Sequence, residues 1–185
     1  VAGRKPERAS TYDLGFVAGP RLNAAGRLDD MALGIECLLT DNPDQALKLS
    51  QQLDTLNRER RAIEADMVES AESITQDLNL ESQDCFSLCL HEPGWHQGVI
   101  GILASRLKDR FHRPVIAFAR ASGGELKGSG RSIAGLHLRD ALDLVSKRHP
   151  SLIKKFGGHA AAAGLSIAEA DFVSFVAAFE QVCGE

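Results

Sequence analysis

The feature that most constrains the fold is a stretch of roughly 36 residues, between Asn42 and Asn79, that has only an opening proline and no glycine. Asn42 is a good helix N-cap, Pro43 suits the first helical position, and Gln45 completes a capping-box pattern. Apolar residues follow at spacings of three and four, which predicts one helix about 54 Å long. Its narrow apolar stripe and many charges are typical of a connector between two lobes, with dimerisation through the stripe as the alternative.

The composition is that of an ordinary soluble globular protein, with 44% apolar and 25% charged residues in a chain of 185. No apolar run approaches the roughly 18–20 residues of a membrane span, and no signal peptide opens the chain. The chain begins with Val1, so we expect a piece of a longer, cytoplasmic protein. Its cysteines lack metal-ligand spacing and are predicted to be reduced thiols. They are Cys37, Cys85, Cys89 and Cys183.

Before the long stretch, residues 1–10 are polar and aperiodic and are predicted to form a loose tail. The segment 19–28 holds two arginines and an asparagine around a double alanine. It is predicted either to pack its backbone against a polar partner or to form a solvent loop that caps the next helix. Asp29 or Asp30 can be the N-cap of that short helix. Its apolar positions are Met31, Ile35 and Leu38.

Beyond residue 81, short apolar runs alternate with amphipathic stretches, which predicts a compact α/β domain over residues 81–185. The predicted strands lie at 85–90, 114–119, around Leu126 and at 165–167. Cys85 and Cys89 are predicted to share one face of the first strand. The predicted helices lie at 99–111 and 137–148 and around the apolar stripe of Phe172, Phe175, Val176 and Phe179.

Charge is distributed unevenly along the chain. Residues 96–160 hold 12 Lys and Arg against 4 Asp and Glu, whereas the remainder holds 9 basic and 21 acidic residues. The net charge of −4 argues weakly against a nucleic-acid partner, but this segregation reverses the argument. One third of the chain is strongly cationic, which favours a localised anion-binding face.

Two glycine-rich segments lie within this cationic third. Segment 127–132 is Lys-Gly-Ser-Gly-Arg-Ser, and segment 154–164 holds Gly-Gly-His before four alanines. Such small residues allow a ligand to approach the backbone, and the glycines on either side of Ser129 are predicted to leave room for a phosphate. Together the segments predict donors that face one anionic ligand, with two tight turns in a small α/β domain as the alternative.

His96 and His159 both lie beside glycine-rich turns and are candidate ligand contacts. Neither has Asp and His companions at the spacing that a catalytic metal requires. No arrangement of nucleophile, base and orienting group is found either. The residues therefore predict a chain that holds an anion without cleaving it.

Four motifs occur in the order found in a known family, at residues 21–27, 96–101, 128–132 and 157–159. In these motifs, and over nearly its whole length, the chain resembles the RecJ family of single-strand-specific 5′ to 3′ DNA exonucleases, part of the DHH phosphoesterase superfamily. The resemblance implies an enzyme of DNA repair and recombination whose catalytic domain binds Mn²⁺ or Mg²⁺ through Asp and His, including an Asp-His-His motif. It also implies three partners: single-stranded DNA, a single-stranded-DNA-binding protein and a helicase.

The sequence departs from the family pattern because it contains no Asp-His-His. The resemblance therefore implies a middle fragment, in which residues 1–28 are the trailing edge of the catalytic domain, 29–80 are linker helices and 81–185 are a small mixed-sheet DHH-associated domain. This fragment is predicted to bind no catalytic metal and to be inactive alone.

By the same resemblance, Ser129 and Arg131 would hold the 5′ phosphate, while Arg21 or Arg27 would approach the strand from the other lobe. The complete predicted binding set is Arg21, Asn23, Arg27, His96, Ser129, Arg131, Ser132, Gly157, Gly158 and His159. Two alternatives stay open. One is another DHH-type phosphodiesterase that acts on oligonucleotides or cyclic dinucleotides, and the other is a non-enzymatic nucleic-acid-binding module like that of alanyl-tRNA synthetases.

Overall fold

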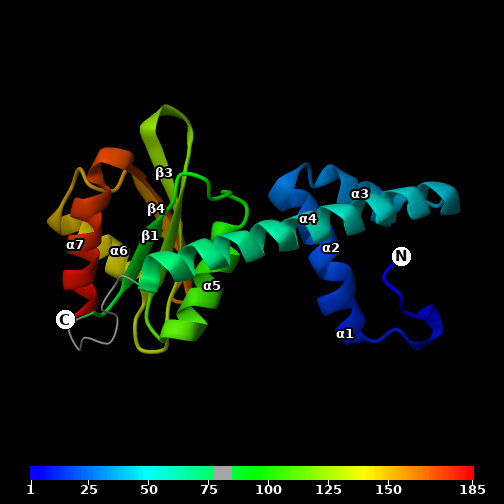
Figure 1. Cartoon of the computed structure of the whole chain (residues 1–185), viewed down its shortest axis with the longest axis horizontal. Coiled ribbons are helices and arrows are strands. Elements are labelled where there is room, and N and C mark those ends of the chain that lie inside the picture. The colour runs from blue at the N-terminus through cyan, green and yellow to red at the C-terminus, as the bar shows by residue number, and fades with distance from the viewer. Residues whose placement is uncertain (77–84) are drawn as a thin grey trace. The chain divides into compact units, whose positions relative to one another are not determined.

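The computed structural model describes residues 1–76 and 85–185 (Figure 1). Its internal contacts divide the chain into two compact units, Val1–Ala65 and Asp66–Glu185. The helix that was predicted from the uninterrupted stretch is α4, Pro43–Gln76, and its residues contribute to both units. The predicted division at residues 28 and 80 stays a prediction.

The N-terminal unit is entirely helical. Before α4 it contains η1 (Pro6–Arg8), α1 (Thr11–Asp13), the π-helical η2 (Leu14–Ala18), α2 (Gly19–Leu28) and α3 (Ala32–Leu39). The segment 19–28 is therefore a helix, and the alternative of a solvent loop there is wrong. Ala24 and Ala25 are fully buried in it, so the double alanine allows close helix packing. The N-cap of α3 is Met31, so the prediction of Asp29 or Asp30 there is wrong, although Asp30 Oδ1 accepts from the Ala32 amide at 2.8 Å.

The start of α4 follows the predicted cap in part. Asn42 Oδ1 accepts from the amides of Asp44 and Gln45 at 3.0 and 3.2 Å, which satisfies two donors of the first turn. The Gln45 side chain does not complete the reciprocal half of a capping box, because it bonds Glu36 and Thr40 instead. The predicted end at Asn79 lies outside the described residues.

The C-terminal unit is a five-stranded mixed sheet with helices on both faces, which confirms the predicted α/β class (Figure 1). The strand order is β1-β2-β3-β5-β4; β1 and β2 are parallel and the other neighbours are antiparallel. The strands are β1 (Leu88–His91), β2 (Val115–Arg120), β3 (Glu125–Arg131), β4 (Lys155–Gly158) and β5 (Ala162–Ala168). The helices are α5 (Ile100–Phe111), η3 (Ser122–Gly124), α6 (Leu138–Arg148), η4 (Glu169–Asp171) and α7 (Phe172–Cys183).

The first glycine-rich segment is a strand rather than a turn, whereas the second contains strand residues on both sides of a tight hairpin turn. Segment 127–132 lies almost wholly in β3, and the Gly-Gly pair at 157–158 ends β4, a strand that the sequence did not predict. Cys85 precedes β1, so the predicted strand begins three residues too early and the two cysteines share no strand face.

The hydrophobic core lies between one face of the sheet and helices α6 and α7. A side chain at position 128 or 130 would point toward this core. A Cβ at Gly128 would come within 2.6 Å of Phe118 and Leu165, and one at Gly130 within 2.8 Å of Leu138. These glycines make room for core side chains, so the prediction that they leave space for a phosphate is wrong.

The last turns of α4 pack within the C-terminal unit. Met67, Ala71 and Thr75 are buried, and Trp95 Nε1 donates to Ser70 Oγ at 3.3 Å. Trp95 is itself buried in the segment that leads to α5. This end of the long helix is therefore held against the segment that carries His96.

Candidate nucleic-acid interface

The polar residues of β3 all face the side of the sheet opposite the core. Side chains alternate along a strand, and the glycines at 128 and 130 point into the core. Lys127, Ser129 and Arg131 therefore share the other face. The N-terminal part of α5 covers this face next to Ser129 and Arg131.

Ser129 and Arg131 meet each other and the first turn of α5. Arg131 Nη1 donates to Ser129 Oγ at 3.2 Å and to the Gly130 carbonyl at 2.8 Å. A Cβ placed on Gly101 would lie 3.0 Å from Arg131 Nη2 and 3.0 Å from Ser129 Oγ. A planar guanidinium and a hydroxyl thus lie at the N-terminal end of a helix, where the helix dipole adds partial positive charge.

His96 lies in the turn that begins α5. Its Nδ1 accepts from the Gly98 amide at 3.0 Å, and its carbonyl accepts from the amides of Val99 and Ile100. The side chain is exposed. His96 thus orders the turn next to the Ser129–Arg131 pair while presenting its ring to solvent.

The Gly-Gly-His motif lies in the same layer of the sheet. Ser129 on β3 stands opposite Gly164 on β5, which stands opposite Gly157 on β4. Two strand spacings separate Ser129 from Gly157 by about 10 Å. Both glycines are exposed, and a Cβ on Gly157 would meet nothing within 4 Å. The sheet surface between Ser129 and Gly157, called the floor of the site below, therefore carries no side chains over this width.

Gly158 fixes the turn that presents His159. Its φ is 146°, and a Cβ there would lie 2.4 Å from the Ala162 carbonyl oxygen, so only glycine fits. The His159 amide then donates to the same carbonyl at 2.8 Å, and the His159 side chain is exposed. The motif thus closes a tight β4–β5 hairpin with a histidine at its tip.

Ser132 is buried, and its hydroxyl donor is used within the fold. Oγ donates to the Leu136 carbonyl at 2.9 Å, and its amide donates to the Ala161 carbonyl at 2.9 Å. These bonds tie the β3–α6 loop to the β4–β5 hairpin around a pocket of about 390 Å³. That pocket is lined by Ser132, Ile133, Ala134, Gly135, Leu136, His137, Ala160 and Ala161.

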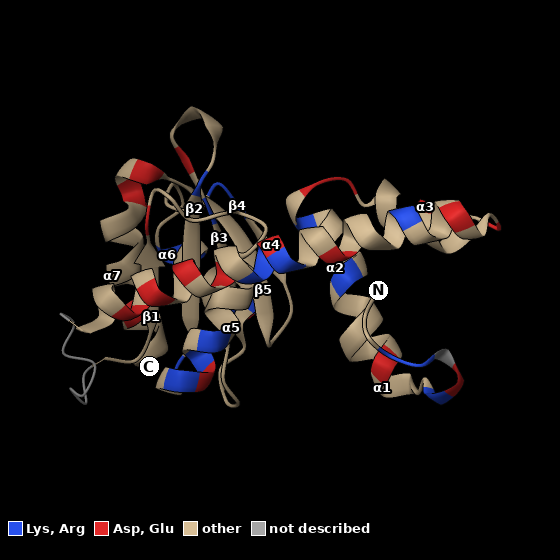
Figure 2. Cartoon of the chain, turned by 45° about the vertical axis from the view of Figure 1, so that its right-hand side comes forward, with Lys and Arg blue, Asp and Glu red and all other residues tan. Residues whose placement is uncertain are grey.

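Folding compensates part of the predicted charge segregation. Arg110, Arg120 and Arg148 pair with Glu72, Glu169 and Glu185, all acids from outside the cationic third. Figure 2 shows the cations of this unit in separate groups, one at the C-terminal end of α5 and another near β2 and β4.

Two lysines from the glycine-rich segments, neither of them in the predicted binding set, belong to the face of Ser129 and Arg131. Lys127 stands opposite Ser166, which stands opposite Lys155, and both lysines are exposed. Neither forms an ion pair within residues 1–76 and 85–185, although both lie near Glu125 and help to lower the pKa of its carboxyl after the larger contribution of Lys154. Their charge was readable from the sequence, but their shared face depends on strand register.

The remaining predicted residues belong to the N-terminal unit. Arg21 bonds Asp54, with Nε and Nη2 each 2.8 Å from Oδ1, and its Nη1 donates to the Val17 carbonyl at 2.7 Å. Its guanidinium therefore ties α2 to α4. Asn23 is exposed and Arg27 is half-buried on the same helix.

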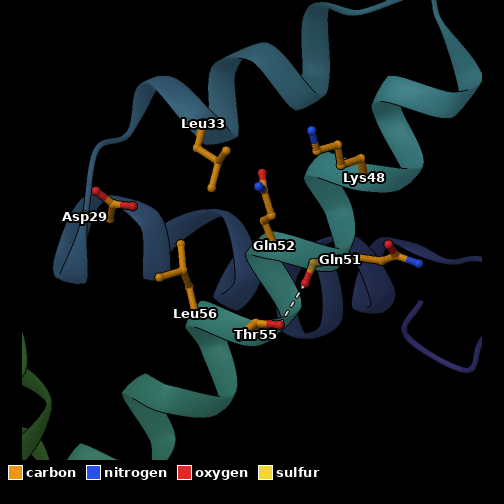
Figure 3. Close-up of a pocket in the computed structure, with 7 residues that line it drawn as sticks. All are labelled: Asp29, Leu33, Lys48, Gln51, Gln52, Thr55 and Leu56. Atoms are coloured by element: carbon orange, nitrogen blue, oxygen red, sulfur yellow. Dashed lines mark hydrogen bonds between the residues drawn. The ribbon is translucent and has the colours of Figure 1, made fainter.

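A second pocket, of about 430 Å³, opens between α3 and α4 (Figure 3). Leu33 and Leu56 point into it, with the Gln52 amide between them. None of the predicted binding residues lines it. Its lining is Asp29, Leu33, Lys48, Gln51, Gln52, Thr55 and Leu56.

The described residues do not fit a catalytic metal. Within residues 1–76 and 85–185, no group of three or more His, Cys, Asp or Glu is placed to hold an ion. Burial and the nearby Glu180 carboxylate raise the pKa of Cys183 to about 12, and burial also raises the pKa of Cys89, so both stay thiols at neutral pH. None of the helices in this described part is long and apolar enough to cross a membrane.

The chain is similar to exonucleases of one kind over its whole length. It is 55% identical to the single-stranded-DNA-specific exonuclease RecJ of Dickeya dadantii and 52% identical to that of Escherichia coli, and covers 32% of each. The crystal structure of Thermus thermophilus RecJ in complex with Mg²⁺ matches 99% of this chain and 27% of that one, at 31% identity and a TM-score of 0.81. The same protein is also known in complex with Mn²⁺.

The resemblance that the four motifs predicted is thus confirmed, and the chain spans about a third of the length of the curated relatives it matches. The model of the DHHA1 domain matches residues 83–185, which contain the mixed sheet and the Ser129–Arg131 site. Because that match covers more than half of the chain, this protein belongs to the DHHA1 domain family.

Proposed function

We propose that this chain is the substrate-binding part of a single-strand-specific 5′ to 3′ DNA exonuclease, and that it holds the 5′-phosphorylated end of the strand. One observation carries the proposal: Ser129, Arg131 and the N-terminus of α5 come together on the face of the sheet that also carries Gly157. The similarity to RecJ exonucleases supports the choice of substrate.

This arrangement suits a terminal phosphate. The planar guanidinium of Arg131 can bond two phosphate oxygens at once, and Ser129 supplies a hydroxyl. The helix N-terminus favours negative charge in the same place. A terminal phosphate monoester carries more negative charge than an internal diester, so these groups favour a 5′-phosphorylated end over a 5′-hydroxyl end.

Beyond the end group, the strand needs a surface for its backbone. Gly164 and Gly157 leave the adjacent floor open, and Lys127 and Lys155 place two positive charges along the same face. Phosphates that follow the 5′ end can lie along this floor and release counterions. His96, in the turn before α5, and His159, at the tip of the β4–β5 hairpin, both have exposed side chains.

The residues described here position and neutralise the substrate. Hydrolysis requires divalent ions that other parts of a longer protein would hold, since no described cluster in this chain fits them. The metal complexes of Thermus thermophilus RecJ support Mg²⁺ or Mn²⁺ in that role. In the whole enzyme the chain would fix the end of the strand so that the bond to be cleaved meets the hydrolytic centre.

Binding measurements on the 185-residue chain test this proposal. Fluorescence anisotropy with 5′-phosphorylated oligo-dT should give tighter binding than with 5′-hydroxyl oligo-dT. The logarithm of affinity should fall with the logarithm of salt, at about −0.7 per phosphate neutralised. Tighter binding of tRNA, or of a cyclic dinucleotide, would favour one of the two alternative functions. Equal affinity for both DNA ends would overturn the assignment of the 5′ phosphate.

A further inference from the structure

Gly101 is the second residue of α5, and it lies against both members of the proposed phosphate site. We infer that Gly101 is a positioning residue, whose missing side chain allows Ser129 and Arg131 to lie against the helix N-terminus. The inference rests on the proposed function, because it concerns the same site. It assigns a specificity-determining role to a residue that contributes no side-chain donor.

The local sequence offers no other reason for glycine at this position. Glycine is a poor helix residue, and alanine there would favour the helix. A Cβ at Gly101 would lie 3.0 Å from Arg131 Nη2 and 3.0 Å from Ser129 Oγ, whereas ordinary contacts of this kind are 3.4–4 Å. An added methyl group must therefore move both groups by a few tenths of an ångström.

That displacement matters because the guanidinium and the Ser129 hydroxyl are bonded to each other. Arg131 Nη1 bonds the Gly130 carbonyl at 2.8 Å and Ser129 Oγ at 3.2 Å. A methyl group that moves Nη2 and Oγ changes the direction in which both present their donors. Hydrogen bonds to phosphate weaken steeply with misalignment. The substitution should therefore weaken phosphate binding without destabilising the fold.

The main chain of Gly101 supports the same inference. The amides of Ile100, Ile102 and Leu103 donate to carbonyls of His96 and Val99. The Gly101 amide has no acceptor within the part of the chain that the structure describes, and the residue is buried. Buried amides without a partner are rare in proteins, and this one belongs to the end of the helix where Ser129 and Arg131 lie.

The test measures how strongly the chain prefers a 5′-phosphorylated oligo-dT over the 5′-hydroxyl form. Gly101→Ala should reduce this preference about tenfold, the size of one charge-assisted hydrogen bond. Its thermal midpoint should not fall, because alanine favours the helix. Gly94→Ala is the matched control, since a Cβ at Gly94 would meet nothing within 4 Å, and it should leave the preference unchanged.

A double variant separates positioning from a general structural effect. If Gly101 acts through the guanidinium, adding Gly101→Ala to Arg131→Ala should cause little further loss of preference. The inference would be overturned if the losses of preference in the two single variants multiplied in the double variant. It would also be overturned if Gly101→Ala weakened binding of both kinds of end and lowered the thermal midpoint.

The failures of the two proposals are distinguishable. If Arg131→Ala leaves the preference unchanged, the proposed phosphate site itself is wrong. If Arg131→Ala reduces the preference but Gly101→Ala keeps it within about twofold of the original, the phosphate site stands and the role of Gly101 is refuted.

Discussion

The two units of the chain differ in how much of their apolar surface they bury. In the C-terminal unit the sheet and helices α6 and α7 enclose a core with fully buried Phe118, Phe175 and Phe179. The N-terminal unit exposes many large apolar side chains, among them Tyr12, Leu14, Phe16, Met31, Ile35, Leu38, Leu39 and Leu47. A helix gains most of its stability by burying an apolar face. The C-terminal unit therefore carries its own stabilising core, whereas α1, η2 and α3 leave much of their apolar surface uncovered.

The largest expected effect tests this difference in stability. Phe118→Ala should destabilise the C-terminal unit by about 3–5 kcal/mol, because a fully buried aromatic ring leaves a cavity in the core. Leu39→Ala should change the stability of the N-terminal unit by less than about 0.5 kcal/mol, since Leu39 is 75% exposed. Urea denaturation followed by circular dichroism measures both. A comparable loss for Leu39→Ala would show that α3 is covered in solution.

The next effect compares one arginine from each unit. In a full-length exonuclease that carries this chain, Arg131→Ala and Arg131→Lys should both slow degradation of 5′-phosphorylated ends about 10- to 150-fold more than that of 5′-hydroxyl ends. Lysine should not rescue the preference, because it lacks the planar fork. Degradation rates of end-labelled oligonucleotides give this ratio. Equal losses on both kinds of end, or a large drop in melting temperature, would assign Arg131 to structure.

Arg21→Ala is the counterpart in the N-terminal unit. Arg21 is partly buried and binds Asp54 and a backbone carbonyl, so its removal should destabilise that unit by about 1–2 kcal/mol. The preference for a 5′ phosphate should stay unchanged, because the guanidinium is already engaged within its own unit. Urea denaturation and the same rate ratio separate the two roles, and a selective loss on phosphorylated ends would support Arg21 as a member of the predicted binding set.

The features predicted best from the sequence are local ones, formed by residues close together along the chain. The N-cap of α4 follows from Asn42 alone, since a cap is formed by residues two and three positions away. The roles of Gly128 and Gly130 could not be predicted, because they depend on register: a shift of one residue would turn these glycines from Phe118 toward the phosphate site. Strand β4 was missed because Lys-Phe-Gly-Gly has weak strand propensity and pairs only at the sheet edge. Gly101 was missed because its significance comes from β3, about 30 residues later.

The smallest expected effect concerns the acid sensitivity of the C-terminal unit. Burial lowers the pKa of His91 from its usual 6.5; the positive charge of Arg120 acts in the same direction, while the carboxylates of Glu169 and Glu92 oppose it. Its buried Nε2 has no hydrogen-bond partner among residues 1–76 and 85–185, and its ring packs against Phe172. A neutral imidazole suits these surroundings, and a charged one does not.

The direction of the pH effect follows from proton linkage. Because the folded pKa of His91 lies below the unfolded value, the unfolded state binds more protons as the pH falls through 6.5. The His91 contribution is fully present above pH 6.5 and is lost as the pH falls through the folded pKa. Glu125, Glu169 and Glu185, whose pKa values are lowered from 4.5 by Lys154, Arg120 and Arg148, lose their contributions only below pH 4.5. In the N-terminal unit, Asp13 titrates below its usual 3.8 because the Ser10 amide and hydroxyl donate to it.

Acidification from pH 7 to 5 should therefore weaken the C-terminal unit before the N-terminal one. His91→Phe should remove that early loss while keeping a ring against Phe172. Urea midpoints at pH 7, 6 and 5 for the original chain and the variant measure the difference. If the urea midpoint fell equally for the original chain and the variant, a group other than His91 would cause the acid sensitivity. The difference between the two units would then not include a difference in their pH dependence.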